Sequence, residues 1–294
     1  MRLLNAAFCL FACGLSIQCG AAQSLTARQI VQQIQQRLGV AIPAKTVDTF
    51  KAGDPDTVVT GVAVTMIATF DVLERASAQG CNLVITHEPT FYNHLDTTEN
   101  LEKQGDAVLA QKKKFIADQH LVVWRFHDGW HARHPDGILL GMTRTLGWKN
   151  FQDSSEPHRF SLPPTTLLDL AAELRRKLEI SVLRVVGNPS AKVSQVALLP
   201  GAAGSARQIA LLERGDVEVL IIGETPEWET VEYVADAASE GRPISLILLG
   251  HVPSEQAGMQ ECAQWISSFM AGIPVKFVPA SAHFWGLSTS TNLR

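Results

Sequence analysis

The sequence predicts an α/β protein with two lobes, and three observations support this class. Short apolar runs of strand length alternate with segments of helical length along almost the whole chain. Several of these runs are apolar at every position, which indicates strands that are covered on both faces of a sheet. The segment Lys149–Pro164 has little periodicity and is therefore the expected boundary between the lobes.

The elements of the first half are bounded by recognisable residues. Ser24 can cap a first helix, and Gly80 and Gly147 follow the ends of two others. Strands are predicted at Thr57–Met66, Asn82–Thr86 and Leu121–Phe126. Helices are predicted at Leu25–Leu38, Phe70–Gln79, Leu101–Asp118 and Ile138–Leu146.

The second half continues the alternation. Pro163 and Pro164 precede its first helix, and the turn Gly201–Gly204 precedes its second. That turn is interpreted mainly as a tight connection, although its backbone N–H groups could also cradle an anion. Strands are predicted at Ser181–Val186, Val193–Leu199, Val217–Ile222, Ile244–Leu249 and Pro274–Val278. Helices are predicted at Thr165–Leu178, Ala206–Arg214, Glu227–Glu240 and from the end of the fourth of these strands to about Met270.

The composition excludes some function classes. The 294 residues are 46% hydrophobic and 18% charged, as in a packed globular protein, and the net charge is −4. A basic surface for nucleic acid is not indicated, because the one run of cations, Lys112–Lys114, fits the solvated face of a helix. We expect a small-molecule substrate and no nucleic-acid partner.

Residues 1–22 have the features of a secretory signal peptide. Arg2 precedes the mostly apolar run Leu3–Ile17, and Gly20–Ala22 offers small residues for cleavage before Gln23. We therefore expect a periplasmic or secreted protein whose mature chain has no membrane span. Lipidation at Cys13 is an alternative to simple cleavage.

The cysteines do not form a disulfide framework. Removal of residues 1–22 leaves two cysteines, Cys81 and Cys262, too few for such a framework or for a cysteine-based zinc site. Two buried free thiols are the preferred interpretation, and a single bridge between them is the alternative.

Three polar clusters each follow a predicted strand. In chain order they are His87 with Glu88, then His127 with Asp128 and His131, then His251 with Glu255. Ligands of open α/β sheets bind beyond the carboxyl ends of the strands, so the three clusters can converge. The remaining histidines, among them His94 and His158, are interpreted as ordinary polar side chains.

The mixture of imidazoles and carboxylates suits transition metals. Zn²⁺, Mn²⁺ or Fe²⁺ fit it better than Ca²⁺ or Mg²⁺, which prefer oxygen ligands alone. His251 and Glu255 are four residues apart, a spacing that places both on one face of a helix. A pair of such cations can activate water, and His127 or Asp128 could then carry the proton.

Several of these segments resemble a known family. Ile85–Pro89 reads Ile-Thr-His-Glu-Pro and resembles the "ITHHP" signature of the NGG-interacting-factor-three-like family, also known as the type-two form of GTP cyclohydrolase I. Gly250–Glu255 resembles its "GHxxxE" segment, and Ile222–Glu224 resembles its "TGE". The order and spacing fit over about residues 25–280.

The sequence departs from the family pattern at two positions. Glu88 stands where the second histidine of "HHP" is expected. His131 stands where the aspartate of the "HTxxD" motif falls if His127 aligns with its histidine. We infer a reciprocal exchange that conserves the ligand set and its charge. A shifted alignment would instead make Asp128 the ligand, leaving His131 outside.

The resemblance implies an architecture and a metal site. It implies two α/β lobes with a dinuclear site, the metal lobe comprising residues 24–150 and 225–294 and the second lobe residues 151–224. It also implies a homo-oligomer, since members form ring-like hexamers. The implied ligands are His87, Glu88, His251, Glu255 and either His131 or Asp128.

Two functions are consistent with these features. The first is a metal-dependent hydrolase or cyclohydrolase that acts on a cyclic amide or amidine, a nucleotide-like ring or a phosphoester. The second is a non-catalytic protein that uses the same ligands for metal handling or assembly. An open coordination position facing a pocket favours the enzyme, and a closed ligand shell favours the alternative.

Overall fold

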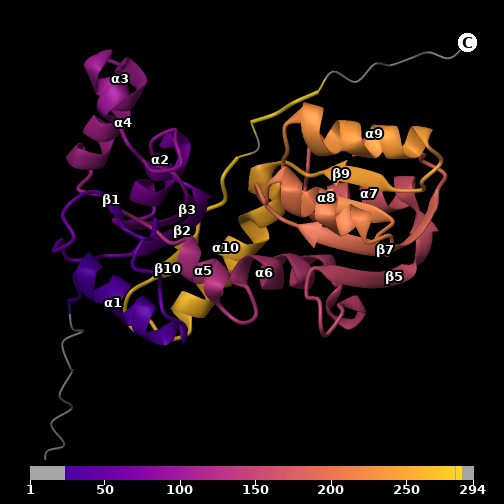
Figure 1. The fold of residues 1–294 in the computed structure, drawn as a ribbon. Helices are drawn as coiled ribbons and strands as arrows, with labels where there is room; N and C mark the ends of the chain where they lie inside the picture. Colours follow the sequence, from indigo (N-terminus) through magenta and orange to yellow (C-terminus); the bar gives the residue numbers. More distant parts are fainter. Residues whose placement is uncertain (1–23, 282, 287–294) are drawn as a thin grey trace, which may run out of the picture.

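The chain folds around two five-stranded sheets, each with helices packed on it (Figure 1). This computed structural model describes residues 24–281 and 283–286. The expected signal peptide at residues 1–22 lies outside the described residues. No helix within the described ranges is long and apolar enough to cross a bilayer. The predicted α/β class with two lobes is confirmed.

The first sheet is parallel except at one edge, where β1 runs antiparallel to β4. Across the sheet, its strands are β1 (Phe50–Ala52), β4 (Val122–Arg125), β3 (Leu83–Glu88), β2 (Val62–Ile67) and β10 (Val275–Phe277). The helices of this lobe are α1 (Ala27–Arg37), α2 (Phe70–Ala78), α3 (Glu99–Lys103), α4 (Ala107–Asp118), α5 (Asp128–Ala132), α6 (Gly137–Leu146) and α10 (His251–Ser267). The three central strands are almost fully buried, which explains why their sequences do not alternate.

The second sheet has a parallel centre and two antiparallel edges. In spatial order, its strands are β5 (Arg159–Thr166), β7 (Lys192–Leu199), β8 (Val219–Ile222), β9 (Ser245–Leu248) and β6 (Arg184–Val186). Its helical segments are a 3₁₀ turn at Lys149–Phe151, α7 (Leu167–Lys177), α8 (Ser205–Glu213), a π-helical turn at Glu227–Val231 and α9 (Glu232–Ser239).

The strand order moves the expected boundary between the lobes. Sequence analysis assigned residues 225–294 to the first lobe, but β9 pairs with β8 and β6 in the second sheet. Helix α9 also packs on that sheet, with Val234 and Ala237 in its core. The chain therefore returns to the first lobe at Gly250, where β9 ends and α10 begins.

Several elements differ from their predictions, including the unpredicted β1 and α5. The helix predicted at Leu101–Asp118 is divided into α3 and α4, because Gly105 adopts a left-handed φ of 65° and Asp106 caps α4. The helix predicted at Glu227–Glu240 begins with a π-helical turn. β5 was not predicted, because Pro163 and Pro164 argue against a central strand. It lies at the sheet edge, where proline is tolerated, and its register is irregular there.

Helices α6 and α10 connect the two lobes (Figure 1). Ile138 of α6 belongs to the core of the first lobe, while Leu139 and Met142 belong to a core of the second. The two helices cross closely: a Cβ on Gly141 would lie 2.5 Å from the Cα of Gly258. This crossing determines where the start of α10 lies relative to the first sheet.

We expect Gly141→Val to lower the free energy of unfolding by about 1–3 kcal/mol, because the added carbons meet backbone of α10 that cannot move aside locally. Chemical denaturation monitored by circular dichroism measures this change. Ala110→Leu, at an exposed position of α4, is the control and should change stability by less than about 0.5 kcal/mol. Equal stability of the two variants would contradict a tight crossing.

Candidate metal centre

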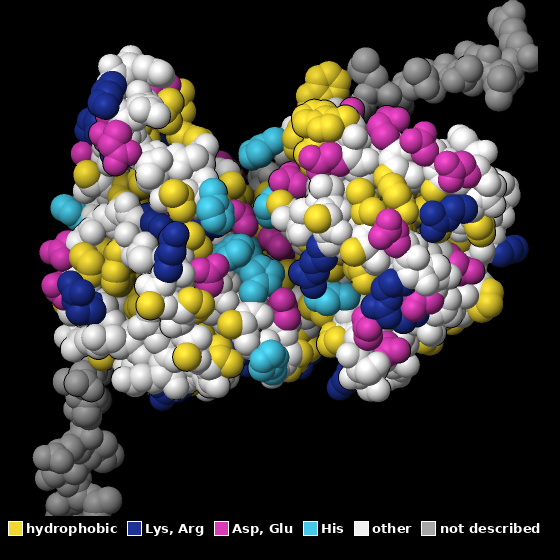
Figure 2. Space-filling view, in the orientation of Figure 1, with side chains coloured by type: hydrophobic (Ala, Val, Ile, Leu, Met, Phe, Trp, Pro, Cys, Tyr) yellow, Lys and Arg dark blue, Asp and Glu magenta, His cyan; other side chains and the backbone are white. Residues whose placement is uncertain are grey.

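The three polar clusters of the sequence meet at the junction of the two lobes. His87 and Glu88 end β3, His127 immediately precedes α5, and His131 lies within α5. The third cluster opens α10 and follows β9, a strand of the other sheet. The clusters therefore converge where the first lobe faces the second, and histidine side chains gather in the hollow between the lobes (Figure 2).

Glu255 lies at the middle of this group. Its carboxylate Oε2 is 3.6 Å from Nε2 of His87 and 3.2 Å from Nε2 of His251. Its Oε1 is 4.0 Å from Nε2 of His131. Three imidazoles from three different elements thus face one carboxylate whose side chain is only 4% exposed.

Glu88 forms a second point of convergence. Its Oε1 lies 3.4 Å from Nε2 of His251 and 3.6 Å from Nε2 of His127. Its Oε2 lies 3.2 Å from Nη2 of Arg125, a fully buried guanidinium. His251 therefore contacts both carboxylates and connects the two halves of the group.

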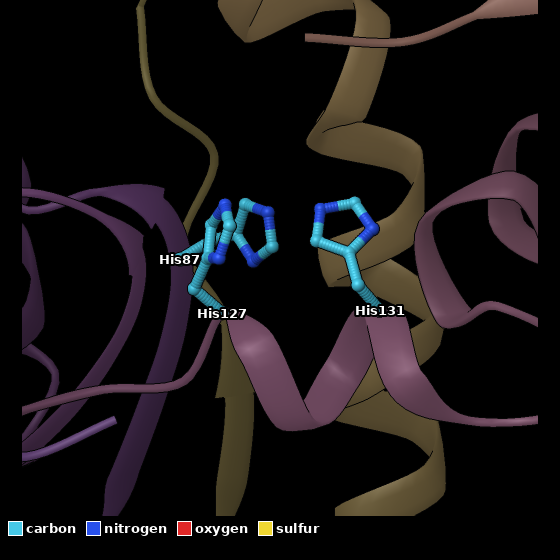
Figure 3. A group of neighbouring side chains, drawn as sticks. All are labelled: His87, His127 and His131. Carbon is cyan, nitrogen blue, oxygen red and sulfur yellow. The ribbon is translucent and has the colours of Figure 1, made fainter. Parts of the chain in front are cut away.

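Three of the imidazoles also face one another directly. The rings of His87 and His127 stack with centroids 4.6 Å apart, and the ring of His131 approaches within 5.0 Å of His87 (Figure 3). His87, His127 and His131 each offer a ligand atom within 4.8 Å of the others, and His87, Glu88 and Glu255 do the same. Two overlapping sets of possible ligands therefore share His87.

Every imidazole in the group is oriented in the same way. A carbonyl or carboxylate oxygen lies next to each Nδ1, so Nδ1 donates to that oxygen and Nε2 is the nitrogen that can bind a cation once it carries no proton. The Nδ1 partners are Phe126 O at 3.1 Å for His87, Asp128 at 2.8 Å for His127, Asp136 at 2.9 Å for His131 and Glu224 at 3.2 Å for His251.

The positions of Asp128 and His131 bear on the two alignments. Asp128 directs Oδ1 at His127 and Oδ2 at the Thr46 hydroxyl and the Val47 N–H. It therefore orients the His127 ring through Nδ1, the nitrogen that does not face Glu88. His131 directs Nε2 toward Oε1 of Glu255, at 4.0 Å.

Asp48 holds this segment in place. Its carboxylate accepts hydrogen bonds from the N–H groups of His127, Asp128 and Gly129, at 2.7, 2.9 and 2.8 Å. These groups begin α5 and would otherwise lack partners. The buried Asp48 thus positions His127 and, one turn later, His131.

The charges of the group are divided between neutral and cationic imidazoles. Burial lowers the pKa of His87 well below its ordinary value, and neighbouring imidazoles lower it further, so this ring is neutral at pH 7. Burial also opposes the charge of His251, but hydrogen bonds with Glu224, Glu255 and Glu88 raise its pKa to about 12. The acids around His251 therefore favour a positive charge, which a proton or a divalent cation can supply.

Two buried polar atoms in the group indicate that a metal suits these residues. Nε2 of His87 and Oε2 of Glu255 are buried and form no hydrogen bond of good geometry among the described residues, although Oε2 lies 3.2 Å from Nε2 of His251. Unpaired buried polar atoms are costly, and cation ligation would satisfy both. Gly201 comes so close that a Cβ there would lie 2.2 Å from Oε1 of Glu255. The residues present therefore fit a metal.

The group opens into a cavity of about 400 Å³ between the lobes. Glu88, His127, His131, His251 and Glu255 all line it. Donor atoms are thus accessible to a small molecule, unlike those of a closed structural site.

Sequence analysis missed several residues that support the group. Asp136 and Glu224 orient two of the imidazoles, and Arg125 pairs with Glu88. Glu224 belongs to a segment that resembled a family motif, and Asp136 precedes a predicted helix, a common capping position. His94 and His158, interpreted as ordinary polar side chains, line the cavity. Cys81 and Cys262 are buried free thiols, which is the interpretation preferred from the sequence.

Known proteins share this fold. SA1388, a hypothetical protein of Staphylococcus aureus, superposes with a TM-score of 0.69 at 16% identity, covering 90% of this chain and 100% of that one. A Bacillus cereus protein related to NIF3 superposes with a TM-score of 0.67 at 13% identity, covering 89% and 98%. At such identities the likeness concerns the fold alone.

The sequence comparisons define the family. A Chlamydia trachomatis protein named GTP cyclohydrolase 1 type 2 homolog is 22% identical over 223 residues, covering 74% of this chain and 82% of that protein. The profile of Duf34/NIF3 (NGG1p interacting factor 3) matches residues 44–283, which include all three polar clusters and both lobes. The resemblance noted in the sequence is thereby confirmed, and the chain belongs to the Duf34/NIF3 (NGG1p interacting factor 3) family.

Proposed function

We propose that the chain is a dinuclear metal-binding protein that acts as a metal-dependent hydrolase or cyclohydrolase on a small molecule. The observation that carries this proposal is the convergence of four Nε2 atoms and two carboxylates beside one cavity, which all of these residues except the buried His87 line. Mixed nitrogen and oxygen ligands suit Zn²⁺, Mn²⁺ or Fe²⁺.

The residues would hold two cations in two groups, and Glu255 faces both groups. His87 and His131 would hold one cation, because both face Glu255. Glu88 and His251 would hold the other, because His251 contacts both carboxylates. When bound, such cations act as Lewis acids and lower the pKa of water to near neutrality.

The remaining residues of the group act on protons and on orientation. His127 lines the cavity with a side chain that is 24% exposed, and its Nδ1 donates to Asp128. That pair can accept a proton at Nε2 while the Asp128 carboxylate stabilises the resulting imidazolium. We assign proton transfer to His127 and the orienting role to Asp128.

The name of the chlamydial relative suggests GTP as one candidate substrate. We also propose export, on the features of residues 1–22, and an exported protein would rarely meet GTP. A cyclic amide, an amidine or a phosphoester is therefore an equally reasonable substrate to test.

We expect purified protein from metal-replete growth to contain about two equivalents of Zn, Mn or Fe per chain, measured by inductively coupled plasma mass spectrometry. His251→Ala should lose at least one equivalent, because it removes a contact to both carboxylates. His120→Asn is the control, since His120 is exposed, precedes β4 whereas His127 follows it, and does not line the cavity. Metal-free protein, or unchanged content in His251→Ala, would refute the centre.

The same measurement separates the two alignments. His131→Ala should lose metal outright. Asp128→Asn should retain it with an affinity lowered by about 10- to 100-fold, as expected for a residue that orients a ligand. The reverse pattern would identify Asp128 as the ligand.

Metal binding should release protons. The pKa of His251 is raised to about 12, so this imidazole holds a proton at pH 7 and must give it up to a cation. The pKa of His131 is also raised, by its hydrogen bond to Asp136 and by the nearby acids, which acts in the same direction. Affinity should therefore fall as the pH falls from about 8 to about 6, by about tenfold per unit for each proton released. Calorimetric titration in buffers of different ionisation enthalpy counts these protons, and a count of zero would contradict the charge assignment.

Turnover tests the catalytic part of the proposal. We expect metal-loaded protein to hydrolyse at least one of GTP, dihydrouracil and p-nitrophenyl phosphate, with activity abolished by chelation. His127→Ala should retain its metal yet lose about 10²- to 10⁴-fold in rate, the usual contribution of a general acid or base. Activity that survives chelation would exclude the proposed mechanism.

A further inference from the structure

The cavity has a second wall that the metal centre does not use. Opposite the ligand cluster it is lined by Arg207 of α8, by His158 and by Ala202 and Ala203 of the preceding turn. The centre comes mainly from the first lobe, whereas this wall belongs entirely to the second.

Arg207 carries a charge that no acid neutralises. Within the described part of the chain, no carboxylate oxygen lies within 4.0 Å of its guanidinium. Arg207 also lies in the first turn of α8, which begins at Ser205. The N–H groups and dipole of a helix start disfavour a cation there, so this placement is unfavourable unless an anion is nearby.

His158 holds the guanidinium in position. Nδ1 of His158 lies 2.8 Å from the Leu198 carbonyl oxygen and must donate to it. Nε2 therefore bears the lone pair and accepts from Nη2 of Arg207 at 3.1 Å. Burial of the ring, together with the charge of Arg207, lowers the pKa of His158, so this acceptor persists at neutral pH.

The turn before α8 contributes further donors. Gly204 precedes the helix, and no side chain caps its first N–H groups. Gly201 and Gly204 have φ values of 64° and 82°, which allow the turn to pass close to the centre. Ala202 and Ala203 present small side chains to the cavity and leave room beside Arg207.

The acids on the cavity walls do not neutralise this cation. Glu88 pairs with Arg125 and His251, Glu255 faces His87, His131 and His251, and Asp136 pairs with His131. The guanidinium is thus the free charge of the second wall. A planar guanidinium suits the oxygens of phosphate or carboxylate, which it can bind through two parallel hydrogen bonds.

We propose that Arg207, held by His158, binds an anionic group of the substrate, a phosphate or a carboxylate, while the reacting part of the substrate lies at the ligand cluster. The position of the reacting part rests on the proposed function, whereas the binding of an anion by Arg207 does not. The cavity of about 400 Å³ suits a small-molecule substrate.

The test compares the wild type with Arg207→Met and Arg214→Met. Each substitution removes one exposed positive charge, at Arg207 within α8 or at Arg214 directly after it. Arg214 pairs with Glu156 and does not line the cavity. The probes are inorganic phosphate and acetate, titrated calorimetrically into each protein before and after chelation, with metal content measured in parallel.

We expect Arg207→Met to weaken binding of at least one probe by about 10- to 100-fold with metal content unchanged, and Arg214→Met to leave it unaltered. The tighter probe identifies the anion as phosphate or carboxylate. Equal affinity in the wild type and Arg207→Met would overturn the proposal, and so would binding that depends on metal alone. If the protein is metal-free and its anion binding still requires Arg207, the proposed function is refuted but the anion site at Arg207 is supported.

Discussion

The buried carboxylate of Glu255 is the constraint around which the junction between the lobes is built. Glu255 is 3% exposed, and a charge removed from water is costly unless cations or donors surround it. His87 reaches it from β3, His131 from α5 and His251 from its own helix. The turn at Gly201 also passes over it at a distance that excludes a side chain. Elements from both lobes are thus held in place by one carboxylate.

The closeness of α6 and α10 makes this arrangement possible. The two helices cross where Gly141 meets Gly258, and α6 contributes to the cores of both lobes. A wider crossing would move the first turn of α10 away from the end of β3. The ligand geometry therefore depends on glycines that have no chemical role.

Glu88 shows how the chain accommodates its departure from the family motif. A carboxylate at this position needs a cation beside it, and the fully buried Arg125 provides one at 3.2 Å. The other nitrogens of Arg125 donate to the carbonyl oxygens of His87 and His94, and Asp96 lies 3.7 Å from Nη1. Arg125, which lies outside the segments that resemble the family, therefore neutralises the carboxylate at position 88.

The sequence by itself determined the α/β class, most of the buried strands and the identity of the clustered side chains, because these follow from local periodicity and from residue types. It also indicated the family, since its signature segments are contiguous. Only the tertiary structure decided that β9 belongs to the second sheet and that the clusters meet at the junction of the lobes. It likewise decided the orienting roles of Asp136 and Glu224 and the pairing of Arg207 with His158. The physical reason is that hydrogen bonds between residues far apart in the chain depend on how sheets and helices pack, which no local pattern encodes.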